Sequence, residues 1–221
     1  MQFTFAKILP IAAAVALVAA CGKKEEKPVE SAAPAPAATA AADTSGGETI
    51  VKIGHAAPLT GGIAHLGKDN ENGARLAVEE VNKDGLTING KKIKLELVGE
   101  DDAADPKTGT AVAQKLVDAK VVAVVGHLNS GVSIPASKIY SDAGIVQISP
   151  SSTNPDYTKQ GFKTTYRVVA TDAQQGPALA NYAAKTLHAK TVAIVDDATA
   201  YGKGLADEFE KTSKADGVNV V

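Results

Sequence analysis

Two short apolar runs, each followed closely by small hydroxyl residues, constrain the fold of this 221-residue chain more than any other feature. The first run, Val121–Val125, is an uninterrupted stretch of β-branched residues and Ala with the length of a strand. Continuous apolarity of this kind is typical of a strand that a parallel sheet buries on both faces. The second run, Ile145–Ile148, continues directly into the sequence SPSST. Because parallel sheets bind ligands at the carboxyl ends of their strands, both turns are candidate binding segments.

Strands and helices alternate along the chain from residue 48 onward. Strands are predicted at 49–53, 92–98, 121–125 and 145–148. Between the first two strands, helical spacing places on one apolar face Ala74, Ala77, Val78 and Val81. Gly85 is placed to end that helix, and Asp105 is placed to cap a second helix that starts at Pro106. This order predicts a Rossmann-like α/β lobe, in which a parallel sheet carries helices on both faces.

A second α/β region is predicted after residue 169. Thr171 and Gln174 have the spacing of a capping box, and the helix behind them should present Leu179, Tyr182 and Leu187. A buried strand at 191–195 and a helix with Leu205 and Phe209 on one face follow, and then a strand begins at 217. The predicted divisions are therefore 48–169 for the N-terminal ligand-binding lobe and 170–221 for a hinge and the beginning of a second lobe.

The first residues predict export from the cytoplasm. Lys7 precedes an apolar segment at 8–17, too short to span a bilayer, and small residues then lead to Cys21. The sequence VAAC resembles the lipobox of bacterial lipoproteins, a family in which the Cys is acylated and becomes the mature N-terminus. We therefore expect a signal peptide at 1–20, and a lipidated Cys21 with a flexible Ala- and Pro-rich linker at 21–47. The alternative is a soluble exported protein in which Cys21 is incidental.

Composition and motifs exclude several classes of function. A net charge of −2 gives no reason to expect a nucleic-acid partner. The chain has one Cys and four scattered His, so neither a metal site nor a cofactor is expected, and no GxGxxG, Walker or GxSxG motif occurs. His127 follows a buried strand and is expected to be structural. The acid pairs Asp101-Asp102 and Asp196-Asp197 lie in polar loops, and no nucleophile and base can be paired, which argues against an enzyme.

The hydroxyl turns fit the chemistry of an amino-acid zwitterion. A helix is predicted at 132–141, with Pro135 in its first turn, so Ser130 lies at a helix N-terminus, where N–H groups and the helix dipole favour an anion. Thr153 offers a donor and an acceptor, and the carbonyl of Ser151 offers another acceptor. Any one of these residues would ordinarily be a simple cap or turn residue. Two such turns on neighbouring strands favour a small-molecule site.

Four blocks of sequence resemble the leucine/isoleucine/valine-binding proteins, the branched-chain amino-acid receptors of bacterial ABC importers. These blocks are GHLNSGVSIPASKIYSDAGIVQISPSSTNP, GEDDAADPKT, DAQQGPALA and YGKGLADEFEK, in the family's order, and the resemblance covers residues 48–221. It implies two α/β lobes, of the periplasmic-binding type I fold, joined by a hinge with the ligand closed between them. Family members continue through a complete second lobe, so this chain is expected to be truncated, with an exposed sheet edge and marginal stability.

The resemblance also implies roles for individual residues. Ser130 and Thr153 would bind the ligand carboxylate, while the Ser151 carbonyl and the Thr153 hydroxyl would bind the ammonium. Leu66 stands where many members place an aromatic residue, and Tyr201 matches a tyrosine of the second lobe that faces the ligand.

The side-chain preference of the site would depend partly on His65, Leu66 and Asn129. Some members join the positions of Ala104 and Asn129 by a disulfide, and neither is Cys here.

These features together predict a lipid-anchored periplasmic receptor that binds an aliphatic amino acid and delivers it to an inner-membrane ABC permease. One alternative is a relative with the same fold that binds another solute, such as an amide, urea, another amino acid or an aromatic acid. A secreted α/β enzyme and a structural lipoprotein are the alternatives from other classes. Leu66 weakens the preference for Leu, Ile or Val, because it departs from the family's pattern.

Overall fold

The structure is a computed structural model that describes residues 44–45 and 47–221. The predicted signal peptide and Cys21 lie outside the described residues. The main sheet has the strand order β3-β4-β2-β5-β6-β7, with β1 paired to β2. Its strands are β1 Thr44–Ser45, β2 Glu48–Ala57, β3 Leu86–Ile88, β4 Lys91–Asp101, β5 Ala123–Gly126, β6 Val146–Ser149 and β7 Thr165–Arg167. The pairs from β4 through β7 are parallel, and β1 and β3 pair antiparallel.

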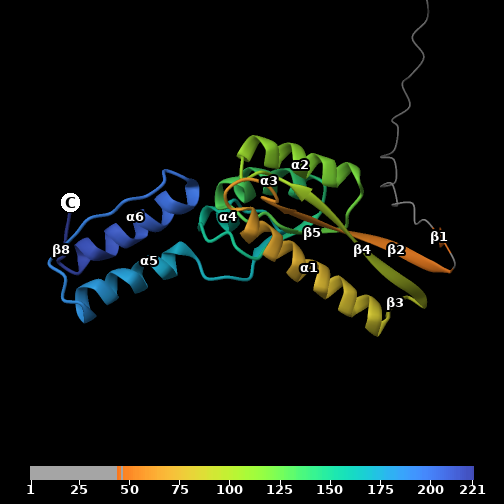
Figure 1. The fold of residues 1–221 in the computed structure, drawn as a ribbon, viewed down its shortest axis with the longest axis horizontal. Coiled ribbons are helices and arrows are strands. Elements are labelled where there is room, and N and C mark those ends of the chain that lie inside the picture. Colours follow the sequence, from red (N-terminus) through yellow and green to blue (C-terminus); the bar gives the residue numbers. More distant parts are fainter. Residues whose placement is uncertain (1–43, 46) are drawn as a thin grey trace, which may run out of the picture. The chain divides into compact units, whose positions relative to one another are not determined.

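Helices cover both faces of this sheet, as the alternation predicted. The helices of this part are α1 Ala64–Asp84, α2 Pro106–Asp118, α3 Ser130–Asp142 and the single turn α4 Asp156–Lys159. Figure 1 shows α1 on one side of β2 and β4, and α2 on the other. The apolar core lies between the sheet and the pair α2 and α3, where Leu116, Val124 and Tyr140 are almost fully buried. The predicted α/β fold of the first lobe is confirmed.

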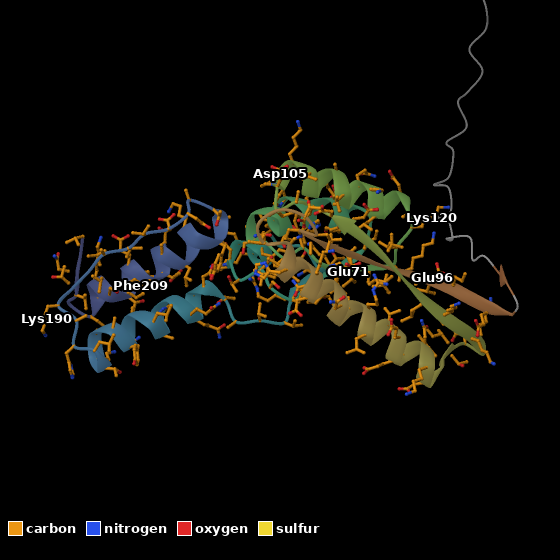
Figure 2. All side chains as sticks on the ribbon, in the orientation of Figure 1. Glu71, Glu96, Asp105, Lys120, Lys190 and Phe209 are labelled. Carbon is orange, nitrogen blue, oxygen red and sulfur yellow. The ribbon has the colours of Figure 1, made fainter. Side chains whose placement is uncertain are left out.

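Local sequence signals set the ends of these elements. Gly85 ends α1 with a φ of 81°, and its N–H donates to the Val81 carbonyl at 3.0 Å. Asn89 and Gly90, both with positive φ, form the turn between β3 and β4. Asp105 caps α2 by accepting the Thr108 N–H at 2.7 Å, and Figure 2 labels it at the start of that helix. The ends at Gly85 and Asp105 were predicted from the sequence.

Several sequence expectations for the first lobe are wrong in detail. Strand β2 runs to Ala57, four residues beyond the predicted end, because Gly54 to Ala57 continue the parallel ladder with β4. Pro135 is the sixth residue of α3, inside the helix and not in its first turn. Val81 is 38% exposed and Val122 is 50% exposed, so neither the predicted α1 face nor the first apolar run is buried throughout.

The region after β7 forms a second group of elements. It contains α5 Asp172–Asn181, a π-helical turn Tyr182–Thr186, β8 Thr191–Val192, α6 Ala200–Ala215 and β9 Asn219–Val220. Strands β8 and β9 pair in parallel. The capping box is present, with the Thr171 N–H donating to Gln174 Oε1 at 3.0 Å. Within the described chain, no helix has both the length and the apolarity needed to span a bilayer.

Two predictions for this second region are also wrong. The strand predicted at 191–195 is paired only at Thr191 and Val192, and Val195 is 95% exposed. The helix predicted to run through Leu179, Tyr182 and Leu187 is α-helical only to Asn181 and continues as the π-helical turn, and these three side chains are each more than half exposed. The helix instead packs on α6 at Gly176, where an added Cβ would lie 2.6 Å from the Glu208 Cβ. The two helix backbones therefore approach each other closely at Gly176.

Candidate ligand-binding site

Ser130 is the first residue of α3 and lies directly after the loop that follows β5. Its side chain is 1% exposed, and its Oγ accepts the Asn154 N–H at 3.2 Å. This bond occupies a lone pair and leaves the hydroxyl proton for a ligand, because a serine hydroxyl has one donor and two acceptor sites. Asn129 precedes it as the N-cap, and its buried Oδ1 has no partner among the described residues.

Ser151 and Thr153 lie in the turn after β6, as predicted. The Ser151 Oγ accepts from Asn70 Nδ2 at 3.0 Å, which ties the turn to α1. The Thr153 carbonyl accepts the Asp172 N–H at 2.9 Å, which ties the turn to α5. The Thr153 hydroxyl oxygen is buried and has no partner in the described part of the chain. A buried hydroxyl without a partner is costly, and a ligand is one way to satisfy it.

A shared carbonyl holds the two hydroxyl turns together. The His127 carbonyl, after β5, accepts from Ser149 Oγ at 2.7 Å and from Ser133 Oγ at 3.1 Å. Ser152 Oγ lies 2.6 Å from Ser133 Oγ and 3.1 Å from the Leu128 carbonyl oxygen, so its single proton can be given to either one. These contacts join the carboxyl ends of β5 and β6 through buried groups. The predicted juxtaposition of the two turns is therefore present in the structure.

His127, Asp102 and Tyr140 form a buried polar network beneath these turns. Asp102 Oδ2 lies 2.7 Å from His127 Nδ1, and His127 Nε2 lies 3.1 Å from the Tyr140 hydroxyl. All three side chains are fully buried, and burial raises the pKa of the Tyr140 phenol well above its usual range. No serine hydroxyl contacts the imidazole in the described structure. The arrangement is not that of a nucleophile and base, and His127 has the structural role expected from the sequence.

Leu66 and Tyr201 lie on α1 and α6, and both side chains are exposed. Leu66 is 47% exposed and lies one helical turn before Asn70, the residue that contacts Ser151. Tyr201 is 44% exposed and follows Ala200 in α6. The Ala200 carbonyl accepts from Asn154 Nδ2 at 2.7 Å, which connects the start of α6 to the hydroxyl turns. The structure thus places both residues on elements that reach the site.

Sequence reasoning missed three residues that the structure places here. Asn154 bonds both Ser130 and Ala200, and Asn70 bonds Ser151. Asp172 is fully buried beside Thr153, and burial raises the pKa of its carboxyl. From the sequence, the place of Asp172 inside a capping box predicted only that a helix starts there. Asn154 could have been found from the sequence, because it directly follows the second hydroxyl turn.

The acid pairs considered in the sequence accept hydrogen bonds from other groups of the protein. Asp101 accepts from the Leu59 N–H and the Thr60 hydroxyl, at 2.8 and 2.6 Å. Asp196 and Asp197 accept from the backbone two residues ahead of each, at 2.7 and 3.0 Å. Among the described residues, no group of three or more metal-ligating side chains converges.

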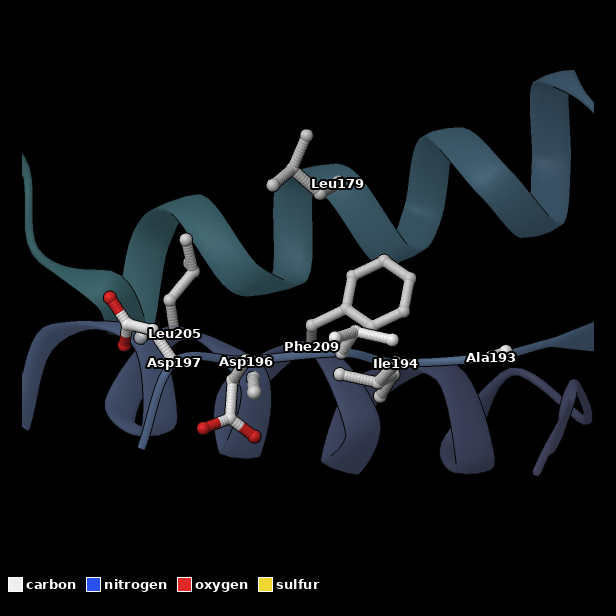
Figure 3. A pocket seen from close by; sticks show the side chains of 10 residues that line it. Leu179, Ala193, Ile194, Asp196, Asp197, Leu205 and Phe209 are labelled. Carbon is white, nitrogen blue, oxygen red and sulfur yellow. The ribbon is translucent and has the colours of Figure 1, made fainter. Parts of the chain in front are cut away.

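A separate groove lies between α5, α6 and the extended segment after β8. Its volume is about 480 Å³, and Figure 3 shows Leu179, Phe209 and Ile194 among its lining side chains. The carboxylates of Asp196 and Asp197 at one end are engaged in their own turns. The groove therefore offers an apolar surface without the paired donor and acceptor groups that an amino acid requires.

The sequence itself matches a known family over this same region. Residues 50–221 match the profile of the family described as periplasmic binding protein. The chain belongs to the periplasmic binding protein family. A family relative, the Leu/Ile/Val-binding protein BraC3 of Rhizobium johnstonii, is 44% identical over 171 residues. The alignment covers 77% of this chain and 46% of that relative, so the chain spans about half the length of the curated relatives it matches.

Solved structures of periplasmic binding proteins share the fold. The branched-chain amino acid binding protein LivJ of Streptococcus pneumoniae, solved with isoleucine, is 34% identical with a TM-score of 0.69. The alignment covers 78% of this chain and 48% of LivJ. A solute binding protein of Rhodopseudomonas palustris, solved with 3,4-dihydroxybenzoic acid, is 28% identical with a TM-score of 0.67, over 78% of this chain and 46% of that one. The resemblance to the Leu/Ile/Val-binding proteins is confirmed.

Proposed function

We propose that this protein is the solute-binding component of an ABC importer and that it binds an aliphatic amino acid between two lobes. It is anchored to the cell envelope membrane through a lipidated Cys21, works in the periplasm and delivers its ligand to an inner-membrane permease. It is not an enzyme. The observation that carries the proposal is the buried, partly unsatisfied set of hydroxyls at the carboxyl ends of β5 and β6.

This set matches the two ends of an amino acid. The N-terminus of α3 and the Ser130 hydroxyl provide donors for a carboxylate, in a place where the helix dipole favours negative charge. The Thr153 hydroxyl and the Ser151 carbonyl provide acceptors for an ammonium. Neutral groups suffice on both sides, because an interior site strengthens each hydrogen bond. Leu66, Tyr201 and Asn129 then border the ligand's side chain.

The relatives support an amino acid as the ligand. The name of the Rhizobium johnstonii relative specifies Leu, Ile and Val, and LivJ was solved with isoleucine. A second candidate ligand is an aromatic carboxylate, because one structural relative was solved with 3,4-dihydroxybenzoic acid. Leu66 weakens the preference for Leu, Ile or Val, since it departs from the aromatic residue that many Leu/Ile/Val-binding members place there. The two candidates share a carboxylate and differ in the ammonium.

Calorimetric titration of the full-length protein distinguishes the amino acid from the aromatic carboxylate. We expect leucine or isoleucine to bind, and 3,4-dihydroxybenzoate, acetamide and urea to bind far more weakly. Binding of the aromatic acid alone, with no response to any α-amino acid, contradicts the amino-acid assignment.

Substitution of the hydroxyls tests the site itself. Ser130→Ala and Thr153→Val are each expected to weaken amino-acid binding roughly 10- to 100-fold, the loss of a hydrogen bond to a charged group. Ser141→Ala, near the other end of α3, is the matched control and should leave affinity unchanged. Full affinity in both site variants would mean that the ligand carboxylate and ammonium are bound elsewhere.

A further inference from the structure

Asp172 is a fully buried carboxylate without a hydrogen-bond partner. It is the first residue of α5, its side chain is 0% exposed, and neither carboxylate oxygen has a partner among the described residues. Its own N–H donates to the Thr153 carbonyl at 2.9 Å, so the residue is fixed beside the second hydroxyl turn. A buried carboxylate with no partner is among the most costly groups that a protein interior can hold.

Arg167, the cation whose charge lowers the pKa of Asp172, hydrogen-bonds to other groups. Arg167 donates to the carbonyls of Ser152 and Asn154 at 2.7 and 2.8 Å and to the Thr158 hydroxyl at 2.8 Å. Its guanidinium also lies over the Tyr157 ring, 5.3 Å from the ring centroid. Arg167 forms no ion pair with Asp172 in the described structure. Asp172 therefore has no ion pair in the described structure, and the charge of Arg167 lowers its pKa only in part against the larger effect of burial.

Backbone covers Asp172 from the side of α6. A Cβ placed on Gly204 would lie 3.2 Å from Asp172 Oδ2 and 2.6 Å from Asn154 Nδ2, so α6 comes this close only because residue 204 is glycine. Glu208, also on α6, raises the pKa of Asp172 further, after the larger effect of burial. With solvent excluded, a positive charge placed near this carboxylate would be strongly attracted to it.

The Thr153 hydroxyl connects Asp172 to the proposed ammonium position. Burial raises the pKa of Asp172, and the Thr153 hydroxyl acts against that effect. The two side chains do not form a hydrogen bond of normal geometry, and both remain without a partner. A hydroxyl that donates its proton to a carboxylate turns its lone pairs outward, where they accept from a cation.

We propose that Asp172 is a positioning residue that makes the site selective for ligands with an ammonium beside the carboxylate. It supplies a buried negative charge behind the Thr153 hydroxyl, and when a ligand binds it accepts the proton of that hydroxyl, so that the Thr153 lone pairs face the ammonium. This inference rests on the proposed function and deepens it. A carboxylate ligand without an ammonium gains nothing from Asp172, since its own charge is of the same sign.

If Asp172 had a purely structural role, its replacement would have different effects. An acid at the first position of a helix interacts favourably with the helix dipole, so a structural Asp172 would stabilise the fold. Its replacement would then lower stability and weaken every ligand alike. The positioning role predicts loss of the ammonium-bearing ligand alone, with stability retained or increased.

The test uses Asp172→Asn in the full-length protein, with leucine and 4-methylpentanoate as probes. The second probe is leucine without its ammonium. We expect leucine affinity to fall roughly 10- to 100-fold, as for loss of a charged hydrogen-bonding group. The affinity for 4-methylpentanoate should not fall. The melting temperature without ligand should be unchanged or higher, because a buried charge has been removed.

Asp156→Asn is the matched control, since Asp156 also opens a helix but is exposed. It should leave both affinities unchanged. Equal leucine binding by the wild type and Asp172→Asn overturns the inference, and so does a parallel loss of both probes with a lower melting temperature. If 4-methylpentanoate binding is undetectable in both proteins, the leucine affinity and the melting temperature decide. Failure of the wild type to bind any amino acid would instead overturn the proposed function.

Discussion

Asp102 and Asp172 are both fully buried carboxylates, and their surroundings are opposite. Asp102 lies 2.7 Å from the His127 imidazole and accepts the Ala104 N–H at 2.9 Å, so its charge has partners. Asp172 has none among the described residues. A paired buried acid belongs to the scaffold that holds the site, whereas an unpaired acid beside a candidate site is more consistent with a ligand-related role.

Asp101, next in sequence to Asp102, gives the fold a specific dependence on pH. Burial alone would raise the pKa of Asp101, but hydrogen bonds from the Thr60 hydroxyl and from the N–H groups of Ala103 and Leu59 outweigh it and lower the pKa. The folded state therefore binds the proton less readily than the unfolded state. Its stabilising contribution is complete above the unfolded pKa of about 3.9 and is lost as pH falls through the lower, folded value.

We expect Asp101→Asn to lower the free energy of unfolding at pH 7 by about 1 kcal/mol, a small value because the carboxylate is partly exposed. The difference between the wild type and the variant should shrink as the pH falls below about 4. Urea unfolding at a series of pH values measures it. A difference that stays constant from pH 7 to pH 3 would show that the charge of Asp101 contributes nothing.

At the scale of elements, the sequence was most informative where one local signal decides the outcome. The cap at Asp105, the end of α1 at Gly85 and the capping box at Thr171 depend on neighbouring residues alone. Burial depends on what packs from elsewhere in the chain. Val122 and Val195 were therefore predicted to be buried from their apolar runs, and both are half exposed or more.

In the candidate site, too, local sequence signals identified some residues and could not identify those that depend on distant contacts. Ser130, Ser151 and Thr153 could be proposed because hydroxyls follow two strands directly. Asn70 could not be found in this way, because it lies 81 residues before the Ser151 hydroxyl that it contacts. Asp172 carried a strong local interpretation as a helix-starting residue, and only its burial and missing partners point to anything more.

Glycines in two helices provide a test of how α5 and α6 pack. A Cβ at Gly176 would lie 2.6 Å from the Glu208 Cβ and 2.8 Å from the Phe209 nitrogen, whereas a Cβ at Gly73 in α1 would meet nothing within 4 Å. We expect Gly176→Ala to destabilise the protein by about 1–3 kcal/mol, as overpacking does. Gly73→Ala should stabilise it by about 0.5–1 kcal/mol through helix propensity.

Thermal or urea unfolding of the two variants measures this pair of effects. Both substitutions add the same methyl group and the same gain in helix propensity, so their difference reports the contact between helices. Stabilisation by both would mean that α5 and α6 do not approach each other this closely in solution.

At the scale of the whole molecule, the candidate site draws on elements before and after residue 169, where we predict the hinge between two lobes. The first lobe supplies the hydroxyl turns, and residues after 169 supply Asp172 and the start of α6, which bonds to Asn154. A receptor built in this way can couple ligand binding to the relative position of two lobes. The importer function that we propose also requires the receptor to remain close to the membrane that holds the permease, which is the role we propose for Cys21.

The anchor is tested by phase separation in detergent. We expect the wild-type protein, expressed with its own N-terminus in a bacterial host, to enter the detergent phase, because two or more acyl chains give stable membrane attachment. Cys21→Ser should enter the aqueous phase and keep its ligand affinity, since residue 21 lies far in sequence from every proposed ligand contact. Ligand binding by the released variant shows that it is folded. Recovery of the wild type in the aqueous phase after export would contradict the anchor and support the alternative of a soluble exported receptor.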